Sequence, residues 1–121
     1  MRQNILTLSL LLLPLASGCN YRVNKVVEDN AGINDTLNKK QYIVYADVKS
    51  LFFDTKCVFC HGSAGGVSVE TYQDTIATLD LIQQAVLVDK SMPPGDSATD
   101  KELLLLQTWI QQGALESAPT N

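Results

Sequence analysis

The sequence predicts a single small all-α domain, on three observations. Its 121 residues leave room for one sizeable core, and 45% of them are apolar, as in a globular protein. Apolar residues recur at helical spacing on both sides of a central segment that is rich in glycine and proline, and a helix-capping pattern precedes the last apolar run. The sequence contains no convincing β-hairpin signal.

Residues 1–18 have the layout of a secretory signal. One basic residue, Arg2, precedes an apolar run from Ile5 to Leu15, and small residues follow this run. The run is much shorter than the roughly 20 apolar residues that are needed to cross a bilayer. We therefore predict that residues 1–18 are a removable signal and not a permanent transmembrane helix.

The end of this segment, Leu15 to Cys19, resembles the lipobox of bacterial lipoproteins. In that family the signal is cut before the cysteine and the thiol receives lipid. The resemblance implies lipidation of Cys19 and anchoring to a bacterial membrane on its periplasmic side. Ala16 stands where leucine is usual in the family. An ordinary secretory signal that leaves Cys19 as a free thiol is the alternative.

Residues 19–41 are predicted to be a polar tether. The segment is rich in asparagine and shows no helical or strand period. A flexible chain of this length has a reach of roughly 23–28 Å, enough to hold a small domain away from a membrane. The alternative is a short ordered arm, in which Val23, Val26 and Val27 pack on the domain.

An amphipathic helix is predicted to begin between Val44 and Asp47 and to lead into Cys57. Its apolar face is formed by residues at helical spacing. These residues are Val44, Val48, Leu51, Phe52 and Thr55.

Cys57 to His61 reads C-V-F-C-H, which is the C-x-x-C-H motif of c-type haem attachment. Two thiols at this spacing in a helical turn can reach both vinyl groups of a porphyrin, and the histidine can then face the iron. Haem of this kind is attached outside the cytoplasm, so the secretory signal and the motif agree. We therefore predict that Cys57 and Cys60 bind one covalent haem c and that His61 is an iron ligand.

Three other readings of the motif are open. A thioredoxin-like redox pair favours a strand before the motif, whereas this motif follows a predicted helix. A structural zinc site needs a tetrahedral set of ligands, and Cys57, Cys60 and His61 leave one position unfilled. A disulfide between the two cysteines leaves the histidine unexplained.

Met92 is the predicted second axial ligand. It is the one methionine left after the signal is removed, and the Pro93-Pro94-Gly95 sequence that follows stiffens an extended loop. A methionine that fills the core is the ordinary alternative. Lys90 is the fallback donor.

Three further helices are predicted after the motif. Residues 70–77 and 80–88 favour two short helices, although the last few residues could form a strand. Thr99 and Glu102 form a capping box for a final helix, and Gly113 ends it. The apolar stripe of this helix contains Leu103, Leu105, Leu106, Trp109 and Ile110.

Residues 42–115 resemble a bacterial single-haem cytochrome c domain of the class I kind, as found in membrane-associated cytochromes. The specific matches are the C-x-x-C-H motif and the Met-Pro-Pro-Gly loop. Weaker matches are Gly62, the Thr71-Tyr72 pair, Trp109-Ile110 and Gly113-Ala114. The resemblance implies a small cytochrome c-like helical domain wrapped around one haem, followed by a tail at residues 116–121.

In this family the first and last helices cross, which implies that Trp109 lies near Leu51 or Phe52. We expect Trp109 to pack in the core and not to bind a haem propionate. No proline follows soon after His61 as it does in mitochondrial members, so the acceptor of its Nδ1 proton is left open.

The expected function is electron transfer, not enzyme catalysis. His/Met ligation fills both axial positions and leaves no place for a substrate. The net charge of −4, which becomes −5 without Arg2, argues against nucleic acid and favours a redox partner with a basic docking patch. With Cys19 lipidated, the mature chain should contain no free thiol and no disulfide.

Two other functions are kept as alternatives. A weak or displaceable Met92 ligand would make the protein a gas-binding haem sensor or a small haem enzyme. A lipid-tethered structural protein with a zinc or disulfide clip is the third possibility.

Overall fold

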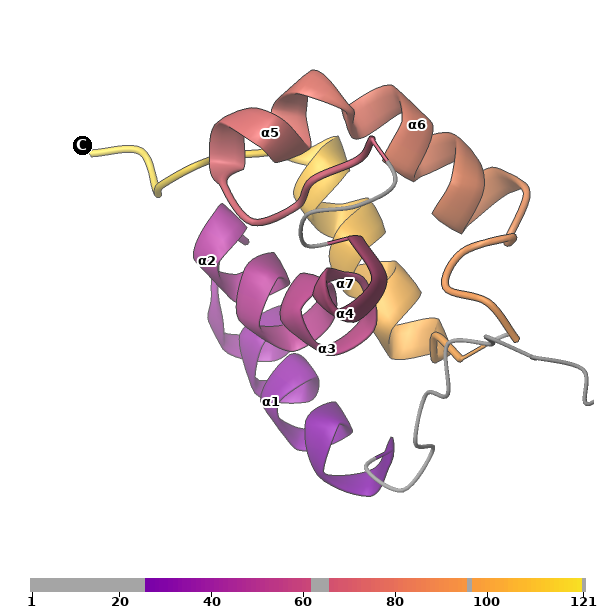
Figure 1. Ribbon diagram of the computed structural model, residues 1–121. Coiled ribbons are helices and arrows are strands. Elements are labelled where there is room, and N and C mark those ends of the chain that lie inside the picture. The colour runs from indigo at the N-terminus through magenta and orange to yellow at the C-terminus, as the bar shows by residue number, and fades with distance from the viewer. Residues whose placement is uncertain (1–25, 62–65, 96, 121) are drawn as a thin grey trace, which may run out of the picture.

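The computed structural model describes residues 26–61, 66–95 and 97–120. They form an all-α fold, and no strand occurs among them, which confirms the predicted fold class. The helical segments run in the order α1 (Val26–Lys39), α2 (Tyr45–Val48), η1 (Lys49–Phe53), α3 (Asp54–Lys56), α4 (Val58–His61), α5 (Tyr72–Ala77), α6 (Leu79–Gln83), η2 (Gln84–Val88) and α7 (Asp100–Gln111). Here η1 and η2 are π-helical segments. Figure 1 shows α5 and α6 on one side of the α2–α4 run, with α7 behind it.

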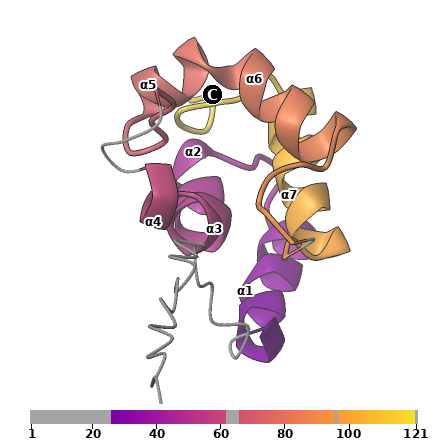
Figure 2. The ribbon, with the colours of Figure 1, turned by 45° about the vertical axis from the view of Figure 1, so that its right-hand side comes forward.

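Helix α1 corrects the expectation of a tether over residues 19–41. Residues 26–39 form a helix that packs against α7, and the side chain of Ile33 is fully buried. In Figure 2, α1 extends downward from behind the lower end of α7. Leu37 lies one helical turn after Ile33 and is partly buried on the same core. The polar composition hid this narrow apolar face, and packing on α7 stabilises the helix.

The predicted helix before the motif is confirmed. α2, η1 and α3 follow one another without a break from Tyr45 to Lys56. The carboxylate of Asp47 accepts a hydrogen bond from the backbone N–H of Val44, at 3.1 Å, which satisfies a donor at the helix start.

The final helix is also confirmed, with both of its predicted end signals. Thr99 accepts a hydrogen bond from the Glu102 backbone N–H at 3.3 Å, and Glu102 accepts one from the Thr99 backbone N–H at 2.6 Å. Gly113 follows the last turn with a φ of 96°, which favours glycine.

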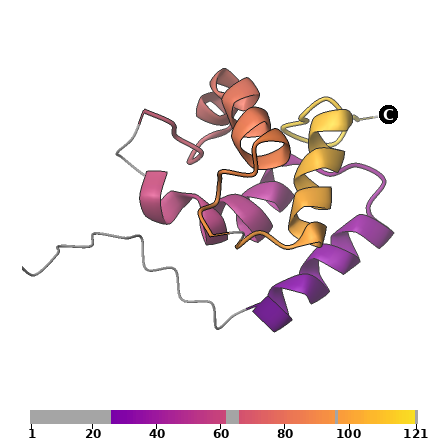
Figure 3. The ribbon, with the colours of Figure 1, turned by 90° about the vertical axis from the view of Figure 1, so that its right-hand side faces the viewer.

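The predicted short helices at 70–77 and 80–88 are confirmed as α5 and as α6 with η2. Thr71 caps α5 by accepting a hydrogen bond from the Asp74 backbone N–H at 3.1 Å. The last residues of the second segment are π-helical, so the strand that the sequence left open does not form. Figure 3 shows the chain descending from this segment to the start of α7.

An aromatic cluster at the centre of the core joins α2 and η1 to α7. Trp109 contacts Phe53 edge-on at 6.1 Å between ring centroids, and it also contacts Tyr45 at 6.3 Å. The expected neighbours were Leu51 or Phe52, and the observed ring contact lies one residue further along. Phe52 is fully buried in the same core as Trp109.

The Trp109 indole N–H donates a hydrogen bond to the backbone carbonyl of Leu115 at 3.0 Å, and the side chain is fully buried. This confirms the expected core role of Trp109. The same carbonyl accepts a hydrogen bond from the backbone N–H of Tyr45 at 2.8 Å. The end of the chain therefore fixes the start of α2.

Candidate functional site

The sequence-predicted site residues Cys57, Cys60, His61 and Met92 line one cavity of about 480 Å³. This volume is within the range of about 300–1,000 Å³ that is usual for small-molecule and cofactor pockets. Most of the other lining residues are apolar and come from η1, from the segment before α5, and from α6 and η2. Among them are Phe53, Val67, Val69, Leu81, Ile82, Ala85 and Val86. The cavity therefore suits a large apolar ligand that Cys, His and Met side chains can hold.

A single helical turn holds the C-x-x-C-H residues. The backbone N–H groups of Cys60 and His61 both donate to the carbonyl of Cys57, at 3.1 and 3.0 Å. The bonds to one carbonyl place both thiol-bearing residues and the histidine within one turn. The predicted helical geometry of the motif is therefore present in α4 and the residue before it.

His61 carries a buried polar atom that lacks a partner. Its Nδ1 is buried and makes no hydrogen bond within the described part of the chain. A buried, unsatisfied ring nitrogen is costly, and such groups in folded proteins frequently mark functional positions. The acceptor that the sequence left open is not found among the described residues.

The two cysteines of the motif are not bonded to each other. Cys57 is a free thiol, and Cys60 is disulfide-bonded. A thioether at Cys60 and this disulfide exclude each other, since both use the same sulfur atom.

Burial raises the pKa of the Cys57 thiol to about 12, against the smaller opposing effect of the positive charge of Lys56. Burial acts in this direction because it disfavours the charged thiolate. The thiol therefore stays protonated at neutral pH, as expected for a sulfur that faces an apolar cavity.

Met92 is held by its backbone and extends its side chain freely. Its N–H and that of Ser91 both donate to the carbonyl of Ala85, at 3.1 and 2.9 Å, and this fixes the loop to η2. The peptide bond between Met92 and Pro93 is cis, and Pro93 is buried. The side chain of Met92 is 41% exposed, which argues against the alternative that it fills the core.

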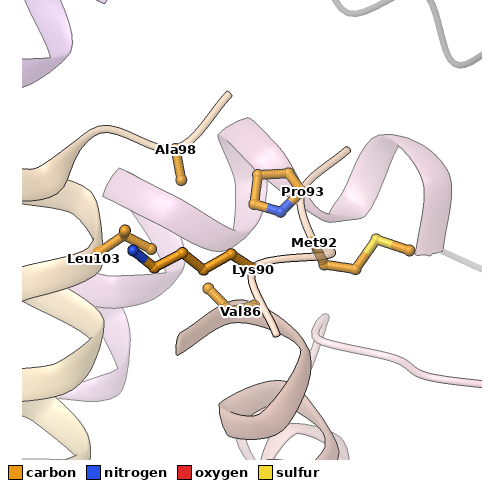
Figure 4. Close-up of a pocket in the computed structure, with 6 residues that line it drawn as sticks. All are labelled: Val86, Lys90, Met92, Pro93, Ala98 and Leu103. Atoms are coloured by element: carbon orange, nitrogen blue, oxygen red, sulfur yellow. The ribbon is translucent and has the colours of Figure 1, made fainter. Parts of the chain in front are cut away.

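Lys90, the fallback donor, lies elsewhere. It lines a smaller cavity of about 30 Å³ with Val86 and Leu103. Figure 4 shows its amino group directed towards Leu103, and the Met92 side chain extending away from that group of residues. Of the two candidate donors, Met92 lines the large cavity with His61 and Lys90 does not.

Lys56 is a lining residue that the sequence analysis missed. Its side chain is 2% exposed, and it precedes Cys57 directly. A helical-spacing signal was present, because Lys56 continues the buried series of Val48 and Phe52 at intervals of four. A charged residue on an apolar face is easily assigned to solvent, and this concealed its position.

The remaining points concern the signal segment, membrane-spanning helices and metal-binding groups. Residues 1–18 and the lipidation site Cys19 lie outside the described residues. No helix in the described part of the chain is both long enough and apolar enough to cross a bilayer. Within the same ranges, no group of three or more His, Cys, Asp or Glu side chains is placed to hold a metal ion.

Comparison with known proteins adds no further assignment. No protein-family model matches the sequence, and neither the curated proteins nor the solved structures give a significant match. The function of this chain must therefore be inferred from its own residues.

Proposed function

We propose that this chain is an exported, lipid-anchored c-type cytochrome that transfers single electrons between periplasmic or membrane redox partners. One observation carries the proposal. Residues that the sequence selects for haem attachment and ligation, separated by more than thirty positions, line the same apolar cavity.

The chemistry of the donor set fits a haem c. Cys57 and Cys60 would hold it through thioethers, and His61 and Met92 would supply the axial ligands. When bound, a haem with these ligands supplies a one-electron couple and has no open coordination position. The chain's own contribution is to exclude water with its apolar lining and to hold the two donors in place.

The first experiment is mass spectrometry of the mature protein, with a visible spectrum of the same sample. We expect the mass of one haem and of lipid on a chain that begins at Cys19, together with a Soret band. A chain without haem, with Cys60 still in a disulfide, would overturn the proposal. Cys57→Ser with Cys60→Ser is the matched control and should carry no covalent haem.

The exposure of Met92 keeps a second function open. A ligand on a partly exposed residue is easier to displace than one on a buried residue, which favours the gas-binding sensor or small haem enzyme as an alternative. In the family that the sequence resembles, Met–iron ligation gives the oxidised protein a weak far-red band. That band, without rapid CO binding to the reduced protein, supports the carrier. Rapid CO binding without the band supports the sensor.

The proposed membrane anchor is close to the folded domain. Only residues 20–25 separate Cys19 from α1, so a fully extended chain places α1 at most about 25 Å from the lipid. A Cys19→Ser variant should appear in the soluble periplasmic fraction, with its haem retained. Membrane retention of this variant would remove the lipid anchor from the proposal.

The net negative charge supports a partner with a basic docking patch. Association of this kind weakens with salt. Electron transfer with the physiological partner should therefore slow as ionic strength rises. A rate that does not depend on salt would argue against docking by charge.

A further inference from the structure

A buried ion pair connects the motif helix with the segment that follows Met92. The Lys56 amino group lies 3.3 Å from the Glu102 carboxylate, and both side chains are 2% exposed. Lys56 also donates a hydrogen bond to the backbone carbonyl of Ser97 at 2.8 Å. The other Glu102 oxygen accepts the Thr99 backbone N–H at 2.6 Å. Both charged groups therefore have additional polar partners.

An ion pair this deep is not explained by stability alone. Removing two charges from water costs several kcal/mol, and apolar replacements of similar volume are frequently as stable. Such a pair is best understood through what it connects. Lys56 lies next to Cys57, and Ser97, Thr99 and Glu102 all follow the Met92 loop.

The loop that carries Met92 is thus attached on both sides. Before Met92, the Ala85 carbonyl of η2 accepts two backbone hydrogen bonds from the loop. After Met92, Lys56 reaches across from α3 to the Ser97 carbonyl and to Glu102. Lys56 thereby connects the segment of one candidate axial ligand to the segment of the other.

We propose that Lys56 and Glu102 are positioning residues, which fix the Met92 loop relative to the Cys57–His61 turn and so keep Met92 on the iron. The inference rests on the proposed haem ligation. A purely structural pair would change stability alone, whereas a positioning pair also changes how easily Met92 is displaced.

The test uses full-length protein with its haem and the double variant Lys56→Met with Glu102→Gln. Glutamine keeps the acceptor that the capping box requires, and methionine keeps the length of the lysine side chain. Both charges are removed together, so neither is left alone in the interior. Asp47→Asn is the matched control, because Asp47 occupies the same position at the start of α2, pairs with Lys40 and does not line the cavity.

The readouts are the far-red band of the oxidised protein and the rate of cyanide binding, both measured well below the melting temperature. The double variant should retain covalent haem, lose much of the band and bind cyanide about tenfold faster than wild type. The control should stay within about twofold of wild type, even if its melting temperature falls.

Unchanged band and cyanide rate in the double variant would overturn the inference, whatever happens to its melting temperature. An equal change in Asp47→Asn would overturn it as well. If the double variant does not fold, Lys56→Gln with Glu102→Gln takes its place, because it also removes both charges and keeps polar groups at both positions, with an expected increase of about threefold and the same contrary outcome. A wild-type protein without haem would instead overturn the proposed function, and the inference with it.

Discussion

The starts of α2 and α7 share one local arrangement. In each, a carboxylate at the third helical position accepts the backbone N–H of the residue that precedes the helix. Asp47 does so for Val44, and Glu102 does so for Thr99. The free oxygen of each carboxylate then pairs with a lysine from another segment.

The two starts differ in their surroundings. Lys40 beside Asp47 is 48% exposed, whereas Lys56 beside Glu102 is 2% exposed. Val44 has no side-chain acceptor for capping, whereas Thr99 has a hydroxyl that serves as one. Water reaches the Lys40–Asp47 pair and weakens it, whereas the Lys56–Glu102 pair is shielded from water. Breaking the buried pair should therefore cost more stability than breaking the other. The fully buried Lys56–Glu102 pair lies beside the candidate site, and the partly buried Lys40–Asp47 pair does not.

The largest difference should come from removing each lysine. Lys56→Met leaves the Glu102 carboxylate buried without its charge partner, which should lower the free energy of unfolding by about 3–5 kcal/mol. Lys40→Met removes a partly exposed partner and should cost at most about 1 kcal/mol. Urea denaturation of both variants measures this. If both variants lose the same free energy of unfolding, burial does not determine how much each ion pair contributes to stability.

The Cys57 thiol beside Lys56 should make stability depend on pH in protein that carries no haem. Burial raises its pKa to about 12 from the ordinary value of 9.0. Below pH 9 the thiol is protonated in both the folded and unfolded states. Above pH 9 it ionises in the unfolded chain first, so stability should fall by up to about 1.4 kcal/mol per pH unit as pH rises towards 12.

Urea denaturation of this haem-free protein between pH 8 and 11 tests that dependence, with Cys57→Ser as the control. The control lacks the thiol and should not show this part of the fall. If the two profiles coincide, the fall comes from other groups. The partly buried pair of Lys40 and Asp47 contributes nothing to this effect, since neither residue is among the groups that shift the pKa of Cys57.

The two cap residues should show a smaller contrast. Thr99→Ala removes the hydroxyl that accepts the Glu102 backbone N–H, at a cost of about 1 kcal/mol. Val44→Thr adds an equivalent hydroxyl at a residue that is already extended, with a φ of −115° and a ψ of 166°, and should gain up to about 1 kcal/mol. Thermal melts of both variants check the signs. Destabilisation by Val44→Thr would contradict the parallel between the helix starts.

The smallest expected effect is the salt dependence of the Lys40–Asp47 ion pair. Asp47→Asn keeps an acceptor for the Val44 N–H and loses the ion pair with Lys40, which is worth about 0–1 kcal/mol. Melts at low and high ionic strength should show this small difference shrinking as salt rises. A difference that persists at high salt would indicate that the Lys40 pair is also shielded from water.

Sequence alone determined the features whose causes are local. The end signals of α7 are its own residues, Thr99, Glu102 and Gly113, so the helix was predictable nearly to the residue. The C-x-x-C-H turn is equally local. Met92 was predicted by elimination among few candidates, and it lines the same cavity as His61.

Tertiary structure decided what depends on contacts between distant segments. Helix α1 packs against α7 and η1 and buries Ile33, and a short polar helix has little stability without such packing. Phe53 of η1 contacts Trp109 of α7. Lys56 is buried because Glu102 and the Ser97 carbonyl, more than forty positions away, satisfy its charge. No local pattern contains that information, since the cost of burying a charge is set by partners that only the folded chain brings together.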